Sequence, residues 1–173
     1  MPLRTDMFDL GALRLTVGEG RKLEPFVSLD AYMLGGERYQ VVPELVPVRL
    51  DVSRTTGEGY ALRLRFSATL EGPCMRCLQD AAPEFGVDAR EVFQPGETDE
   101  LASPYVEHGV LDLRGWARDA LALALPATLL CTPDCQGLCA LCGADLNTAG
   151  PEHQHAPEPD PRWARLSELR FDE

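Results

Sequence analysis

The clearest pattern in the chain is an alternation of hydrophobic and polar residues in three successive stretches. It runs through residues 46–52, 60–71 and 84–93, and a polar, glycine-containing segment separates the first two. Because successive side chains of a strand point to opposite faces, this period of two predicts strands that bury one face. The alternation slips after Ala89, which predicts a β-bulge there. Three such strands in succession predict an antiparallel meander.

The period becomes helical after residue 111. Asp112 can cap a helix that runs to about Leu125 and is stopped by Pro126. The apolar residues of this segment share one helical stripe, which we expect to pack on the sheet, with its tryptophan in the core. The stripe consists of Leu113, Trp116, Ala117, Ala120, Leu121 and Ala124.

The remaining segments carry weaker signals. Glycines break residues 1–43 into short pieces, in which we expect a strand and a helix within 10–17 and 26–34. The acidic, turn-rich residues 94–103 predict an exposed loop. Prolines disfavour helix after residue 150, but residues 162–169 can form one or two helical turns.

Composition narrows the classes of partner. The formal net charge is −12, from 28 acidic and 16 basic residues, and Lys22 is the single lysine. A chain this acidic repels phosphate over most of its surface, which disfavours nonspecific nucleic-acid binding. We therefore expect either a local arginine patch or a basic protein partner. The first residues lack the apolar run of a signal peptide, and no apolar stretch is long enough to cross a bilayer. We therefore expect a cytoplasmic protein.

Candidate metal ligands occur as four short pairs of cysteine and histidine residues. The pairs are Cys74–Cys77, Cys131–Cys135, Cys139–Cys142 and His153–His155. A C-x-x-C turn delivers two thiolates to one ion, and four such ligands complete a closed structural zinc site. In a cytoplasmic chain this arrangement favours metal over disulfides. The sequence therefore predicts one or two structural Zn²⁺ ions.

The spacing leaves the grouping of these ligands open. Our preferred partition joins the first two pairs in one site and the last two pairs in another. A close rival joins the two C-x-x-C turns and leaves the other residues incidental, with the histidines in a solvated loop. Gly143 follows the second turn, where a positive φ is often needed. A redox-active C-x-x-C or an iron–sulfur cluster fits this context less well.

These elements together predict an α+β fold. We expect an antiparallel β-meander packed by one main helix, with cysteine-rich zinc-binding elements at the sheet end and in the C-terminal region. The expected division is a zinc-stabilised domain over residues 1–147 and a Pro/His-rich tail over 148–173.

Two further observations bear on function. The chain lacks the common nucleophile, phosphate-binding, dinucleotide-binding and metalloprotease motifs, and a closed zinc site leaves no open coordination position, so we expect no enzyme. Arg63 and Arg65 project from the same side of the second strand, and we expect Arg49 nearby. They form a candidate nucleic-acid-binding patch, although a solvated sheet face is the simpler interpretation of these arginines. His108 is expected to be exposed.

Several motifs resemble those of a known family. The first are Cys74-Met-Arg-Cys77-Leu78 and a helix that Asp112-Leu113 opens and Leu123-Ala-Leu-Pro126 ends. They continue as Cys131-x3-Cys135-x-Gly137-Leu138-Cys139-x2-Cys142-Gly143-x-Asp145-Leu146-Asn147 and Asp160-Pro161-Arg162-Trp163-Ala164-x-Leu166. In order and spacing, from about residue 45 to the C-terminus, they resemble the YceD family, the large ribosomal RNA subunit accumulation proteins.

The resemblance implies a non-enzymatic, cytoplasmic factor for the synthesis, processing or stability of large-subunit (23S) rRNA. Its partner would be the large ribosomal subunit precursor, through a basic ribosomal protein, an assembly factor or rRNA, with no membrane or small-molecule substrate. Many relatives carry C-x-C where this chain has His153-Gln-His155. Because both residue types bind zinc, this difference favours a second metal site. The alternative functions are a zinc or thiol redox sensor and a zinc-bearing protein-interaction module.

Overall fold

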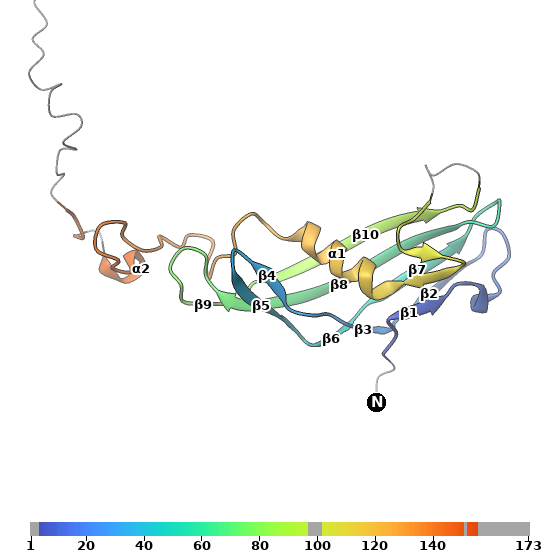
Figure 1. The fold of residues 1–173 in the computed structure, drawn as a ribbon, viewed down its shortest axis with the longest axis horizontal. Coiled ribbons are helices and arrows are strands. Elements are labelled where there is room, and N and C mark those ends of the chain that lie inside the picture. The colour runs from blue at the N-terminus through green and yellow to red at the C-terminus, as the bar shows by residue number, and fades with distance from the viewer. Residues whose placement is uncertain (1–3, 97–101, 151, 156–173) are drawn as a thin grey trace, which may run out of the picture.

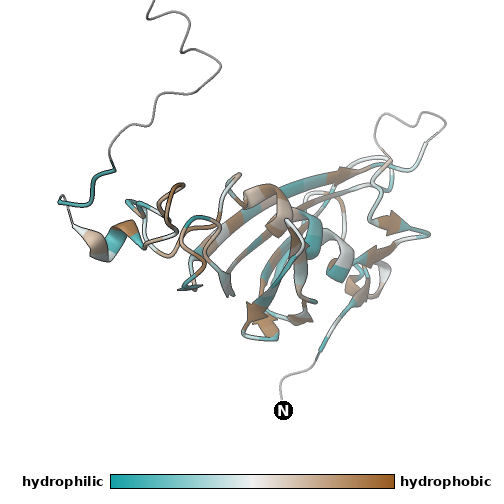
Figure 2. Cartoon of the chain, turned by 60° about the vertical axis from the view of Figure 1, so that its left-hand side comes forward, coloured by the Kyte–Doolittle hydropathy of each residue, from teal (hydrophilic) through white to brown (hydrophobic). Residues whose placement is uncertain are grey.

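The fold is organised around one long strand. The computed structural model describes residues 4–96, 102–150 and 152–155. Strand β8 (Tyr60–Pro73) pairs antiparallel with β7 (Arg49–Arg54) and with β10 (Glu84–Phe93), which confirms the meander (Figure 1). Every second residue of β8 is buried from its start as far as Leu70. The hydropathy therefore alternates along the long strands, and one face of the sheet meets the core (Figure 2).

Shorter strands extend this sheet and add two small ones. The main sheet has seven strands, and its other members are β2 (Gly20–Leu23), β4 (Tyr32–Leu34), β5 (Glu37–Val42) and β9 (Asp80–Ala81). A two-stranded sheet pairs β3 (Phe26–Ser28) with β6 (Leu45–Pro47). A three-stranded sheet contains β1 (Met7–Asp9), β12 (Val110–Asp112) and β11 (Val106–Glu107).

One main helix packs on this sheet assembly, so the observed class is α+β. Helix α1 (Leu113–Ala124) contacts β10, β3 and β1, and the Asp112 carboxylate caps it by accepting from the Gly115 N–H at 2.8 Å. The predicted stripe is buried except for Ala124, which is exposed because the buried contact ends one turn before the helix does. Trp116 lies in the core, 3% exposed, and its ring stacks on Tyr105. None of the helices in the described part of the chain is long and apolar enough to cross a membrane.

The structure corrects several expectations from the sequence. The ladder between β10 and β8 runs without a bulge from Glu84 to Phe93, and the pattern slips because Glu91 occupies an inward position while Val92 points outward, 50% exposed. The expected strand over 46–52 is divided between β6 and β7, which belong to different sheets.

The expected helix within 26–34 is wrong, because that segment forms β3 and β4. Their hydrogen bonds go to β6 and β5, which supply partners that a local pattern does not reveal. Residues 10–17 hold a short 3-10 helix, η1 (Gly11–Leu13), instead of a strand. Residues 97–101 of the expected acidic loop and the expected helical turns over 162–169 lie outside the described residues. The domain boundary after residue 147 stays a prediction.

Candidate metal centres

The first thiol pair sits in the turn that follows β8. The Leu78 N–H donates to the Cys74 carbonyl at 3.0 Å, and the Cys74 N–H donates to the Gln79 carbonyl at 2.7 Å. Leu78 has a positive φ of 63°, which is unusual for a residue with a side chain. These bonds form a tight turn that aims both thiols of Cys74 and Cys77 to one side.

The turn that carries Cys139 and Cys142 repeats this backbone geometry. The Gly143 N–H donates to the Cys139 carbonyl at 2.8 Å, and the Cys139 N–H donates to the Ala144 carbonyl at 2.8 Å. Gly143 occupies the position equivalent to Leu78 and has a φ of 73°, as the sequence predicts. Helix α2 (Leu146–Ala149) follows directly. Two segments far apart in the chain therefore adopt the same turn.

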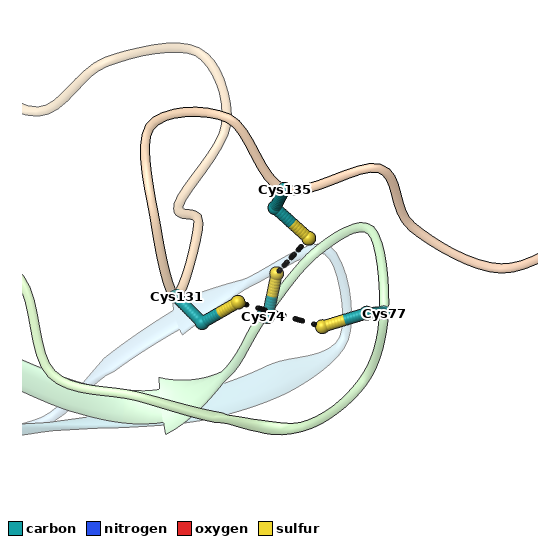
Figure 3. A group of neighbouring side chains, drawn as sticks. All are labelled: Cys74, Cys77, Cys131 and Cys135. Atoms are coloured by element: carbon teal, nitrogen blue, oxygen red, sulfur yellow. Dashed lines mark hydrogen bonds between the residues drawn. The ribbon is translucent and has the colours of Figure 1, made fainter. Parts of the chain in front are cut away.

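Four sulfurs meet at the end of the sheet, and we call Cys74, Cys77, Cys131 and Cys135 the first cluster (Figure 3). The Sγ atoms of Cys74 and Cys135 lie 3.7 Å apart, and those of Cys77 and Cys131 lie 3.5 Å apart. Zinc–sulfur bonds of about 2.3 Å place tetrahedral sulfurs about 3.8 Å apart, whereas a disulfide needs about 2 Å. The donor set and its spacing fit a closed tetrahedral zinc site.

Contacts beyond the thiols hold the first cluster together. The Met75 N–H donates to the Leu129 carbonyl at 2.8 Å, and the Arg76 guanidinium donates to the Cys135 carbonyl at 2.9 Å. Both contacts fasten the segment that carries Cys131 and Cys135 against the turn after β8. Three of the four ligand candidates are at most 2% exposed, and Cys131 is half-buried.

The second cluster consists of Cys139, Cys142, His153 and His155. The distance from Sγ to Nε2 is 3.2 Å between Cys139 and His155 and 3.5 Å between Cys142 and His153, and the two Nε2 atoms lie 3.0 Å apart. A tetrahedral zinc ion would set these distances at about 3.6 and 3.3 Å, so the donor set again fits. Cys142 and His155 are exposed, so this cluster is more open to solvent than the first.

The surroundings of Cys74 and Cys77 in the first cluster shift the pKa values of these two thiols in opposite directions. Burial opposes ionisation of Cys74, but backbone N–H donors of Cys77, Arg76 and Cys131 lower the pKa of its thiol to about 6. The Gln79 N–H favours the Cys77 thiolate, yet burial and the neighbouring thiols raise the pKa of Cys77 to about 12. Ionisation of the Cys77 thiol beside an ionised Cys74 is therefore unfavourable unless positive charge lies between them, which a bound divalent ion would supply.

In the second cluster the neighbouring His153 ring, aided by the backbone N–H groups of Cys142 and Leu141, lowers the pKa of the Cys139 thiol to about 6. The two clusters are the two sets of the preferred sequence partition, and the rival set of two C-x-x-C turns is not the one brought together. That either cluster binds metal stays a prediction.

Asn147 is a neighbour of the first cluster that sequence reasoning missed. Its Nδ2 donates to the Cys135 Sγ at 3.6 Å, and its Oδ1 accepts from the Gln136 N–H at 2.8 Å. The Leu146 N–H also donates to the Gly137 carbonyl at 2.9 Å. The second turn and α2 are thereby fastened to the first cluster. The sequence signals were the position of Asn147 shortly after the second C-x-x-C turn and its place at the end of the family-like motif.

The three candidate arginines lie on the solvent-facing side of the main sheet, away from both clusters. Arg63 donates two hydrogen bonds to the Asp88 carboxylate, the Nε bond being 2.7 Å long, and Arg65 is paired with Asp51. Arg49 is exposed and lies directly opposite Arg65 in the ladder. Nucleic-acid binding by this patch stays a prediction. His108 is exposed as expected.

Comparisons with known proteins place the chain in a family. A family model described as large ribosomal RNA subunit accumulation protein YceD matches residues 62–170. Uncharacterized proteins of Mycobacterium tuberculosis and Mycobacterium bovis are each 34% identical over 123 residues, which cover 66% of this chain and 58% of theirs.

An uncharacterized protein of Mycobacterium leprae is 31% identical over 130 residues, which cover 71% of this chain and 59% of the relative. The chain thus spans less than two thirds of the length of these relatives. No solved structure matches the chain. The family match covers more than half of the chain and includes both clusters, and the chain therefore belongs to the YceD family.

Proposed function

We propose that the chain is a non-enzymatic ribosome-biogenesis factor that supports the synthesis, processing or stability of large-subunit (23S) rRNA. The observation that carries this proposal is membership of a family described by its role in large ribosomal RNA subunit accumulation. The closed, four-ligand form of both clusters supports a structural role for metal, because a catalytic zinc keeps one coordination position open.

Zinc would have a separate task in each cluster. In the first cluster it would join the end of β8 to the segment around Cys131 and Cys135, which lies more than fifty residues further along the chain. In the second it would close a short segment from Cys139 to His155. The proposed unit is a zinc-stabilised domain over residues 1–147 with a Pro/His-rich tail over 148–173.

The proposed partner is the large ribosomal subunit precursor in the cytoplasm. The net charge of −12 favours contact with a basic ribosomal protein or assembly factor over most of the surface. Direct contact with rRNA would need a local basic region. Neither a membrane nor a small-molecule substrate has a part in this proposal.

The test is the ratio of large-subunit to small-subunit rRNA in cells depleted of this protein. We expect a selective fall in large-subunit rRNA that the wild-type gene restores. A matched depletion of an unrelated acidic protein controls for effects on growth. An unchanged ratio in depleted cells would contradict the proposal.

A further inference from the structure

The outward face of the main sheet has an unusual charge pattern for so acidic a chain. In the register of strands β2, β7, β8 and β10, outward-facing residues lie opposite one another in two rows that run across the strands. The first row is Lys22, Asp51, Arg63 and Arg90, and the second is Arg49, Arg65 and Asp88. We call the five cations of these rows the basic face. They outnumber the two carboxylates, although acidic residues dominate the whole chain.

Like charges face each other in this arrangement. Arg49 lies directly opposite Arg65, and Arg63 lies directly opposite Arg90. Directly opposed side chains on neighbouring strands have Cβ atoms about 5 Å apart, and like charges at that distance destabilise a sheet. A surface that sacrifices stability in this way is a candidate binding surface.

The two carboxylates neutralise only part of the basic face. Asp88 is paired with Arg63, and Asp51 is paired with Arg65. Within the described parts of the chain, no carboxylate forms an ion pair with the three other cations. These three, Lys22, Arg49 and Arg90, are all exposed.

The basic face is also hollowed. All five of its cations line a depression of about 540 Å³, together with Ser53, Asp51 and Glu91. Glu24 lies at the neighbouring hollow beside Arg49 and Arg65. The lining of the 540 Å³ depression contains no aromatic side chain on which a base could stack, and the aromatic residue nearby, Phe26, lies in the neighbouring hollow. Cations without stacking platforms suit phosphate groups better than the faces of unstacked bases.

We propose that the basic face binds the phosphate backbone of large-subunit rRNA. The inference rests on the proposed function and identifies RNA as the direct partner at this surface. The acidic remainder of the chain repels phosphate, so binding is confined to this side of the sheet. Recognition there is independent of base sequence and sensitive to salt.

The most informative substitutions are those of the unpaired cations. Replacing Arg63 or Arg65 would also strand a carboxylate, so a loss of binding would be ambiguous. The test variant is therefore Lys22→Ala/Arg49→Ala/Arg90→Ala. A matched control, Arg14→Ala/Arg38→Ala/Arg118→Ala, makes the same change in net charge at exposed positions outside the basic face.

Binding of the full-length protein to transcribed 23S rRNA fragments is measured over a range of salt concentrations. Each phosphate contact on a single strand contributes about 0.7 to the salt slope, hence about fivefold in affinity at 0.1 M salt. Losing three contacts should weaken binding about 100-fold and reduce the slope by about 2. The control should bind like the wild type.

Thermal unfolding of the same variants separates binding from folding. Because the test variant removes one cation from each opposed pair, its melting temperature should equal or exceed that of the wild type. Unchanged RNA binding by the test variant, equal loss in the control, or no RNA binding by the wild type would overturn the inference. Binding of an acidic ribosomal protein instead of RNA to this face would overturn it too. In each of these cases the rRNA ratio in depleted cells still tests the proposed function independently.

Discussion

The hydrogen bond from Asn147 to Cys135 should strengthen metal binding at the first cluster. A zinc ion bound by four thiolates carries a net charge of −2, and this cluster is almost fully buried. An N–H donor directed at a thiolate sulfur offsets part of that charge. Asn147→Asp keeps the oxygen that accepts from Gln136 but replaces the donor with a carboxylate.

The expected magnitude follows from the lost bond. Removing the partner of a charged hydrogen-bonding group costs about 1.5–3 kcal/mol, which corresponds to roughly 10- to 100-fold in affinity. Substitutions next to metal ligands commonly have effects of about this size. Asn147→Ala should therefore weaken zinc binding at the first cluster by about that factor. Asn147→Asp should weaken it further, because the new carboxylate would face both the thiolates and the Asp145 carboxylate that now accepts from Asn147 Nδ2 at 2.7 Å.

The assay is chelator competition for zinc, with Co²⁺ spectra to report thiolate ligation. It is made in the otherwise unchanged chain, where the Co²⁺ bands of a four-thiolate site are distinguished from those of a site with two thiolates and two imidazoles. Thr148→Ala is the control, because Thr148 lies on the same short helix and its hydroxyl donates only to the Asp145 carbonyl. If Asn147→Asp bound zinc within twofold of its parent, the role assigned to this hydrogen bond would be refuted.

Three further predictions concern accessibility, packing and pH. Thiol-reactive reagents should label the metal-loaded protein slowly until a chelator is added. The thiols of the more exposed second cluster should then react first. Fast labelling of the native metal-loaded protein would favour a thiol sensor. Gly72→Ala should lower the free energy of unfolding by about 1–3 kcal/mol, because its Cβ would lie 2.4 Å from the Tyr39 ring. Gly86→Ala, with nothing within 4 Å, is its control in denaturant titrations, and equal midpoints would contradict the prediction. Burial raises the pKa of Tyr32 to about 12, above the value of about 10 in the unfolded chain. The contribution of Tyr32 to the free energy of unfolding is therefore complete below about pH 10 and is lost between about pH 10 and 12, because the unfolded chain ionises first. Tyr32→Phe removes the hydrogen bond to the Arg118 carbonyl and should lower the free energy of unfolding by about 1 kcal/mol at pH 8. The variant should also lose less stability than the wild type between about pH 10 and 12, and an equal loss in both proteins would count against this reasoning.

The sequence was informative where structure depends on neighbours along the chain. The period of two located β8 and β10, the cap at Asp112 located α1, and the C-x-x-C spacing with Gly143 indicated the second turn. Each of these signals is local, because side-chain alternation, capping and positive φ involve residues a few positions apart.

The sequence was uninformative where distant segments meet. The pairing of β3 with β6 and the division of residues 46–52 between two sheets depend on which strands become neighbours. The contact between Asn147 and Cys135 and the ion pairs of Arg63 and Arg65 also require that register. Glu91 interrupts the hydrophobic alternation without a bulge, because a half-buried position of the sheet tolerates a long polar side chain.

The metal content of the purified protein tests most directly whether metal bound at the two clusters stabilises this fold, as the proposed function assumes. Native mass spectrometry and elemental analysis of the full-length protein should find two zinc ions per chain. Cys139→Ser/Cys142→Ser should retain one ion and a folded sheet, whereas Cys74→Ser/Cys77→Ser should lose the ion of the first cluster and much of the thermal stability. A folded, metal-free protein in which the six thiols are all reactive, or are joined as disulfides, would contradict a metal-stabilised fold.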